Sequence, residues 1–197
     1  MNSALLYLPY LPNINWLQNF IKQETVFIER EENFVKSTFR NRCEIAGANG
    51  KQILTIPIVG GRDHHQLYKE VRISYTDNWQ KKHWQAIRSA YGSAPFFEFY
   101  ADKFQPFFER EFEFLFEFNF ELLKATLAVL KLNKNFEFTM LFEGNCIDRI
   151  DLRNNKNSTD IKYYQVFEER NGFVSNLCAL DLIFNEGNRS KEIIVAG

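Results

Sequence analysis

The sequence lacks the short motifs that identify a catalytic class directly. It has no Gly-rich phosphate loop, no Gly-x-Ser-x-Gly and no His-Glu-x-x-His, so the usual signatures of nucleotide-binding proteins, serine hydrolases and zinc peptidases are missing. It also has no excess of charge, because 24 Lys and Arg residues face 25 Asp and Glu residues. Without a net positive field, the chain is not expected to bind nucleic acid.

Cysteine is scarce as well. Cys43, Cys146 and Cys178 are odd in number, far apart and outside any Cys-x-x-Cys pair, so they predict reduced thiols rather than a disulfide framework or a zinc site. The adjacent pair His64-His65 has no downstream ligand pair at a suitable spacing. We therefore predict neither a metal nor a cofactor.

The N-terminus carries no long apolar run. No basic residue precedes the apolar residues 4–8, and their run stops at Pro9, which is too short for a signal peptide or a membrane-spanning helix. A cytoplasmic protein without membrane insertion is the expectation that follows.

Phenylalanine, in contrast, is abundant. Phe supplies 21 residues, and aromatic residues make up 16% of the chain, so large rings should dominate the core and are available to line a pocket. A chain of 197 residues can bury one sizeable core, whereas two halves would each be short of apolar surface. We expect a single domain over residues 1–197.

The first 30 residues give the clearest indication of the fold. Residues 4–8 predict a strand, Asn13 predicts a helix cap before apolar positions at helical spacing, and residues 25–28 predict a second strand. This order forms a βαβ unit, which requires a parallel pair and a right-handed crossover. The predicted fold class is α/β, with a mainly parallel sheet flanked by helices, and α+β is the alternative.

Further elements follow along the chain. Strands are predicted over residues 52–59, 70–74, 136–142 and 163–167. Helices are predicted over residues 79–91, capped by Asp77, and over residues 174–184, closed by Gly187.

Residues 96–132 contain two conflicting periods. Five phenylalanines from Phe112 to Phe120 alternate as in a strand, while a larger apolar set between Phe104 and Leu130 fits a helix. Because a strand of this extent would be atypical, we predict a Phe-rich helical layer of two helices that meet near Gln105. Some of its phenylalanines would then lie on a second side of the helix, which is either covered on two faces or part of a homodimer interface.

Cations gather in residues 36–42. Lys36, Arg40 and Arg42 suit a phosphate, pyrophosphate or carboxylate, since Arg binds planar anions through paired hydrogen bonds. On a strand, Arg40 and Arg42 would point the same way. The alternative is a pair of surface arginines bonded to neighbouring acids.

His83 is the candidate base. It shares a predicted helix face with Trp79 and Tyr91, and the adjacent Lys82 favours the neutral ring that a general base needs. The alternative is a half-buried helix histidine with a satisfied hydrogen bond.

Polar residues also interrupt the apolar C-terminal helix. Asp181 and Asn185 are four apart on one predicted face, and Asn176 lies near the start of the helix. Such residues either brace neighbouring loops or line a site.

Several motifs in one order resemble the WbqC-like protein family, whose members often lie in bacterial surface-polysaccharide gene clusters. The matching segments are Leu8-Pro9-Tyr10-Leu11-Pro12, Arg40-Asn41-Arg42, Leu54-Thr55-Ile56-Pro57-Ile58, Trp79 to Pro95 and Gln165 to Gly187. The sequence departs from the family at Leu8, where many relatives have Gln, and at residues 29–32, where many have a paired Asp motif. Cys178 stands where the family usually has Ser.

In sheets of the predicted kind, ligands bind beyond the carboxyl ends of the strands, and the loop after Leu8 that opens the first helix is such a place. His83 would be the catalytic base. The substrate would be held by Tyr10, Asn13, Lys36, Arg40, Asn41, Arg42, Trp79 and Tyr91. Structural support would come from Gln165, Asn176, Asp181 and Asn185.

The resemblance also implies a function. Modification of O-antigen or related sugars by glycine or acyl transfer is one suggestion for the family, so acyl or aminoacyl transfer to an amino-sugar or nucleotide-linked sugar is the predicted reaction. The alternative is a non-catalytic binding or assembly protein of the same pathway, which would dock through the Phe-rich helix.

Overall fold

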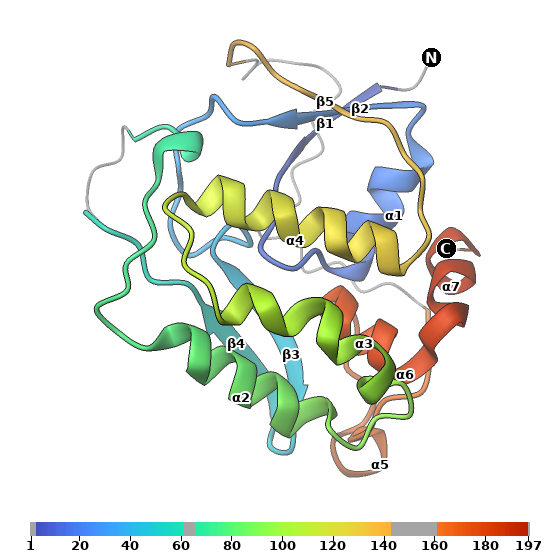
Figure 1. Ribbon diagram of the computed structural model, residues 1–197. Coiled ribbons are helices and arrows are strands. Elements are labelled where there is room, and N and C mark those ends of the chain that lie inside the picture. Colours follow the sequence, from blue (N-terminus) through green and yellow to red (C-terminus); the bar gives the residue numbers. More distant parts are fainter. Residues whose placement is uncertain (1–2, 61–65, 143–160, 197) are drawn as a thin grey trace.

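The computed structural model of the protein describes residues 3–60, 66–142 and 161–196 (Figure 1). The elements in this part of the chain are β1 (Ser3–Tyr7), α1 (Ile14–Lys22), β2 (Thr25–Glu29), β3 (Arg42–Gly47), β4 (Gly50–Thr55), η1 (Tyr68–Glu70), α2 (Trp79–Tyr91), α3 (Phe97–Phe104), η2 (Gln105–Phe108), α4 (Leu115–Val129), β5 (Glu137–Phe138), α5 (Glu168–Asn171), α6 (Ala179–Glu186), η3 (Gly187–Arg189) and α7 (Ser190–Ala196). Helices and strands are mixed, as the predicted fold class requires.

The N-terminal βαβ unit is confirmed. β1 pairs in parallel with β2, from Ser3 opposite Thr25 to Tyr7 opposite Glu29, and β5 adds a third parallel strand on the other side of β2. Asn13 caps α1, because its Oδ1 accepts the Trp16 amide proton at 2.8 Å. The predicted strand over residues 136–142 shrinks to Glu137–Phe138, beyond which one further backbone bond runs from Thr139 to Ile28.

The sequence predicted only part of a second sheet. β3 and β4 form an antiparallel hairpin, but only its second strand was predicted, and it ends at Thr55 rather than at residue 59. Pro57 has no N–H to continue the ladder. Residues 70–74 are not a strand either: they begin in the η1 turn, and Arg72 and Ile73 make only isolated bridges to Phe114 and Ile58.

The Phe-rich region contains two helices, but they do not meet at Gln105. α3 ends at Phe104, the short η2 turn follows, and α4 begins only at Leu115. Phe114 is extended and bridges Arg72, so the strand-like period was correct for the residues just before α4 and wrong within it. Figure 1 shows α4 crossing the molecule between the parallel sheet and the part that contains α2, β3 and β4.

The chain itself covers both sides of α4. Phe118 is fully buried against Tyr10 and Trp79, while Phe116 and Phe120 on the other side pack against Phe138. No side chain of α4 is among the exposed large apolar residues. The first of the two alternatives for this helix is therefore confirmed, and a homodimer through it stays a prediction.

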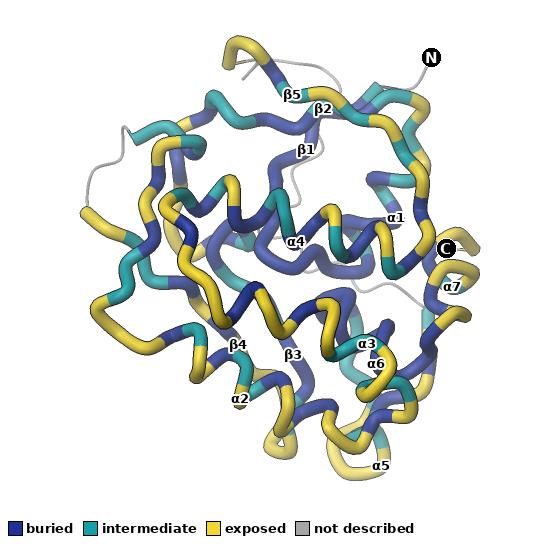
Figure 2. The backbone as a smooth tube through the Cα atoms, in the orientation of Figure 1, coloured by how far each residue is buried: buried dark blue, intermediate teal, exposed yellow. Residues whose placement is uncertain are grey.

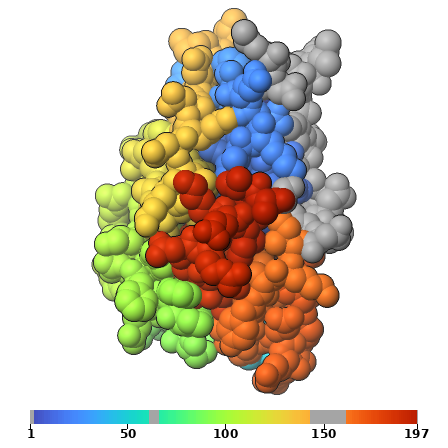
Figure 3. All heavy atoms as spheres, turned by 90° about the vertical axis from the view of Figure 1, so that its right-hand side faces the viewer, coloured from blue at the N-terminus to red at the C-terminus, as the bar shows by residue number. Residues whose placement is uncertain are grey.

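The C-terminal elements begin later than predicted. Residues 163–167 form no strand, because the Gln165 side chain bonds both backbone groups of Val174, at 2.9 Å each, in place of a strand partner. Residues 176–179 bond instead to residues 12–15: Ala179 donates to Pro12 O, Ile14 donates to Leu177 O, and α6 then runs to Gly187. The helix α7 was not predicted. Figure 3 shows it at the centre of one face of the molecule, with α1 and residues 131–142 beside it.

The buried apolar side chains form one cluster that joins these elements. Figure 2 shows β1, most of α1 and α6 as buried, whereas α2 alternates between buried and exposed positions. Within the described ranges, no helix has the length and apolar character needed to cross a membrane.

Candidate functional site

Two candidate residues from distant parts of the sequence meet inside the protein. The Tyr10 hydroxyl lies 3.0 Å from His83 Nδ1, and their rings stack at 5.8 Å. Tyr10 follows β1, at the carboxyl end of the parallel strand, and His83 lies one turn after Trp79 on the buried face of α2. This is the sheet edge where the sequence predicted a site.

Four rings close a circle at this place. Trp79 contacts His83 at 5.1 Å and Phe118 at 5.6 Å, and Phe118 contacts Tyr10 at 5.8 Å. All four residues are buried, and His83 keeps 6% exposure. Such packing fixes the orientation of His83 and Tyr10 before any ligand binds.

Burial controls the charge of His83. It lowers the pKa of His83 to about 4, and interactions with the Thr55 backbone and with Asp77 only partly oppose this shift. The ring is therefore neutral at pH 7. The Tyr10 hydroxyl and His83 Nδ1 share a hydrogen bond, in which the tautomer of the neutral ring sets the donor. Thr55 is itself exposed, so His83 lies directly beneath the surface there.

The His83 pKa predicts acid sensitivity. A histidine with a folded pKa of about 4 and an unfolded pKa of 6.5 binds its proton earlier in the unfolded state, so its contribution to stability is complete above pH 6.5 and is lost as the pH falls toward 4. Between pH 7 and 4.5, this loss is about 2–3 kcal/mol. Urea unfolding of the wild-type protein and of His83→Gln at both pH values should show a stability difference that shrinks by this amount at pH 4.5.

Asp181 titrates in the same pH range, which is why the wild-type protein has to be compared with His83→Gln. Burial raises the pKa of Asp181 to about 6, so its effect has the opposite sign: stability falls as the pH rises from 3.8 to 6. Because both proteins contain Asp181, its effect cancels in the difference. An identical difference at both pH values would mean that His83 titrates normally.

Arg40 lies elsewhere than predicted. It is in the turn before β3 rather than on a strand, and it is fully buried, so Arg40 and Arg42 do not point the same way from one strand. Arg40 Nε donates to Glu32 Oε1 at 3.0 Å, and its guanidinium lies over the rings of Tyr7 and Tyr68 at 5.4 and 5.6 Å. With an acid already bound to it, Arg40 as a substrate ligand stays a prediction.

The other predicted substrate residues are dispersed. Asn13 caps α1, and exposed Lys36 makes no side-chain bond within the described part of the chain. Asn41 Nδ2 donates to Ile56 O at 3.2 Å, while Asn41 Oδ1 and Trp79 Nε1 are buried without a partner in the described residues. The half-buried Arg42 starts β3 and also lacks a side-chain partner among those residues. Asn41 and Trp79 thus keep an unused acceptor and an unused donor within the described part of the chain.

The residues predicted to support the site form one buried network. Tyr163 and Gln165 donate to Asp181 Oδ2 at 2.6 and 2.9 Å, and Asn185 Nδ2 donates to Asp181 O at 2.7 Å. These donors favour the ionised carboxyl and limit the rise of its pKa. The Tyr91 hydroxyl next to this network accepts the Ala46 amide proton at 3.1 Å.

Asn176 ties this region to α1, since its Oδ1 accepts the Asn15 amide proton at 3.0 Å.

Two buried free thiols, Cys43 and Cys178, lie between Asp181 and Tyr10. The sequence analysis did not predict this connection. Cys43 interacts with Tyr10 on one side and with Cys178 on the other, and burial raises the pKa of Cys43 well above its usual value. The alternation of polar and apolar residues from Arg42 to Glu44 was the available signal for this placement.

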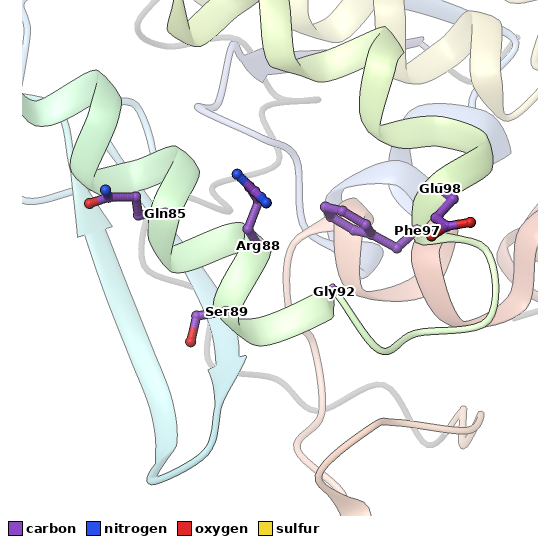
Figure 4. Close-up of a pocket in the computed structure, with 6 residues that line it drawn as sticks. All are labelled: Gln85, Arg88, Ser89, Gly92, Phe97 and Glu98. Atoms are coloured by element: carbon purple, nitrogen blue, oxygen red, sulfur yellow. The ribbon is translucent and has the colours of Figure 1, made fainter.

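Two surface pockets flank the loop between α2 and α3. The first, of about 430 Å³, is lined by Gln85, Arg88, Ser89, Gly92, Phe97 and Glu98 (Figure 4). The second, of about 400 Å³, is lined by Pro95, Phe96, Tyr164, Asn185, Glu186, Asn188 and Arg189. Of the predicted residues, only Asn185 lines either pocket.

Metal-binding potential is low in the described ranges, where no three His, Cys, Asp or Glu residues are grouped to hold an ion. His64, His65 and Cys146 lie outside these ranges.

Comparison with known proteins gives a family but no activity. The sequence model of the WbqC-like protein family matches residues 9–150. Over 109 residues the chain is 31% identical to the uncharacterized protein Rv1507c of Mycobacterium tuberculosis. The aligned region covers 55% of this chain and 46% of that protein. The chain thus matches just under half of that relative's length. No solved structure matches.

Proposed function

Because the chain belongs to the WbqC-like protein family, we propose that it is an acyl or aminoacyl transferase that modifies an amino-sugar or nucleotide-linked sugar in bacterial surface-glycan synthesis. The observation that carries the proposal is the contact between Tyr10 and His83, which joins residues 73 positions apart. A hydroxyl bonded to a neutral histidine is a common arrangement for moving a proton in acyl transfer.

The proposed step is the attack of the acceptor amine on the carbonyl carbon of the donor. The amine nitrogen forms the new bond to that carbon as its proton passes to His83, the bond between the carbon and the donor's leaving group breaks with its electron pair going to the leaving group, and His83 then gives the proton to this departing group. Tyr10 is fully buried whereas His83 keeps 6% exposure, so His83 is the group that would meet the amine, and the Tyr10 hydroxyl would orient its ring through the bond to Nδ1. Burial raises the pKa of Tyr10 well above its usual value, so the hydroxyl keeps its proton while it holds the ring.

A transfer assay tests this proposal. The protein is incubated with acyl-coenzyme A thioesters, or with ATP and amino acids, together with amino-sugar nucleotides, and the product is detected by its mass. We expect product, and we expect Tyr10→Phe and His83→Gln to lower kcat by about 10²–10⁴-fold, the usual contribution of acid–base catalysis. Phe99→Ala, at a side chain 71% exposed, is the control that should leave kcat unchanged. Full turnover by both site variants would remove the proposed role.

A binding or assembly role is the second candidate. Met140, Leu141 and Phe142 are consecutive apolar residues with exposures of 78%, 77% and 57%, which is an uncommon surface for a protein without a partner. The docking surface would then consist of residues just after β5 in the sequence, and it would not lie on α4. Ligand binding without turnover of any donor would favour this role.

A further inference from the structure

The pocket between α2 and α3 has the volume of a small-molecule site. Its 430 Å³ lies within the range of 300–1,000 Å³ that is usual for ligand pockets. Arg88 on α2 and Glu98 on α3 are exposed, whereas His83 is on the buried face of α2. The pocket is therefore separate from the Tyr10–His83 site.

The polar groups of this pocket are not used by the protein. The side chains of Arg88, Glu98, Gln85 and Ser89 make no hydrogen bond or ion pair with any residue that the structure describes. Elsewhere on α2, the exposed Lys82 is paired with Asp77. An unpaired cation and an unpaired anion thus line one pocket.

An aromatic ring lies between the two charges. Figure 4 shows the ring of Phe97 extending from α3 toward α2, with Arg88 on one side of it and Glu98 on the other. Phe97 is half-buried, stacks on Trp84 at 6.2 Å and packs against the buried Phe184 at 5.0 Å. The ring is held in place and offers a fixed apolar surface.

We infer that this pocket binds a free α-amino acid with an apolar side chain. The ligand carboxylate would bond to the Arg88 guanidinium, its ammonium group to the Glu98 carboxylate, and its side chain would pack on Phe97. A phosphorylated ligand would bring at least one further negative charge toward Glu98 with only one cation to hold it. A zwitterion matches both charges of the pocket and leaves neither unpaired.

Isothermal titration calorimetry of the whole protein with leucine, phenylalanine, methionine and alanine tests this inference. We expect binding of at least one of them, and a loss of roughly tenfold to a hundredfold in affinity in Arg88→Gln and in Glu98→Gln, because each removes a charge-assisted hydrogen bond. Both residues are exposed, so both variants should fold. Arg170→Gln, at an exposed arginine of α5, is the matched control and should bind normally.

Ligand analogues test the two ends separately. The N-acetyl derivative of the tightest-binding amino acid lacks the ammonium group, and its amide lacks the carboxylate, so each should bind at least tenfold more weakly than the parent. No binding of any of the four amino acids at 10 mM, about the weakest affinity accessible to calorimetry, would overturn the inference. Unchanged affinity in both pocket variants would overturn it too. Neither result depends on the transferase activity.

Discussion

Replacing Arg40 with methionine should destabilise the protein by about 3–5 kcal/mol, the usual cost of removing one partner from a buried ion pair. Glu32 is 2% exposed, so in this variant a buried carboxylate would lose the guanidinium that pairs with it. Contacts of the guanidinium with the rings of Tyr7 and Tyr68 would be lost as well. The free energy of unfolding in urea at pH 7 measures this cost.

Two further variants separate the ion pair from general damage. Glu32→Gln combined with Arg40→Met removes both charges of the pair, so most of the lost stability should return. Arg72→Met removes a partner of Glu113 from a pair in which the side chains are 56% and 54% exposed, and it should cost under about 1 kcal/mol. If Arg40→Met costs no more than Arg72→Met, then the Glu32–Arg40 pair does not stabilise the fold as its burial implies.

Phe118→Ala should cost about 3–5 kcal/mol, the usual range for emptying a buried phenylalanine site. Phe118 is fully buried, and its ring contacts those of Tyr10, Trp79 and Phe112 at 5.8, 5.6 and 5.1 Å. The cavity would lie directly beside the Tyr10–His83 pair. We therefore expect lower turnover as well as lower stability, because Tyr10 and Trp79 would lose the neighbour that orients them.

Phe99→Ala is the matched comparison. Phe99 is 71% exposed, so its replacement should change the free energy of unfolding by no more than about 0.5 kcal/mol. Chemical denaturation of both variants gives the two values under one condition. Equal costs at the two positions would contradict the placement of Phe118 at the centre of the ring cluster.

Local signals in the sequence were sufficient for the N-terminal unit. The apolar run before Pro9, the Asn13 cap and residues 25–28 each specify their own conformation, and the parallel pairing follows from their order. The helix over residues 79–91 was predicted for the same reason, since its apolar positions recur at helical spacing. Asp77 was wrong as its cap: Asn78 is the N-cap residue, and the Asp77 carboxylate binds Lys82 instead.

Features that depend on distant partners were not predictable from local patterns. Nothing near Arg40 in the sequence shows that Glu32 folds onto it, so a buried ion pair and an anion-binding site have the same local signature. Gln165 belongs to a segment of strand-like composition, but its side chain bonds Val174 and Asp181, and the backbone does not enter a sheet. Tyr10 and His83 were likewise assigned to one site, but no local pattern showed that their side chains meet.

The bonds between residues 12–15 and residues 176–179 determine when this protein can fold. The bond from the Asn15 amide to Asn176 Oδ1 joins positions 161 apart, so ordering these segments closes a loop of most of the chain. Contacts of such long sequence separation slow folding, and this one cannot form until residues 176–179 have been synthesised. During translation, the βαβ unit is therefore complete in the growing chain well before these residues, and until they arrive part of its apolar surface stays uncovered and open to chaperones.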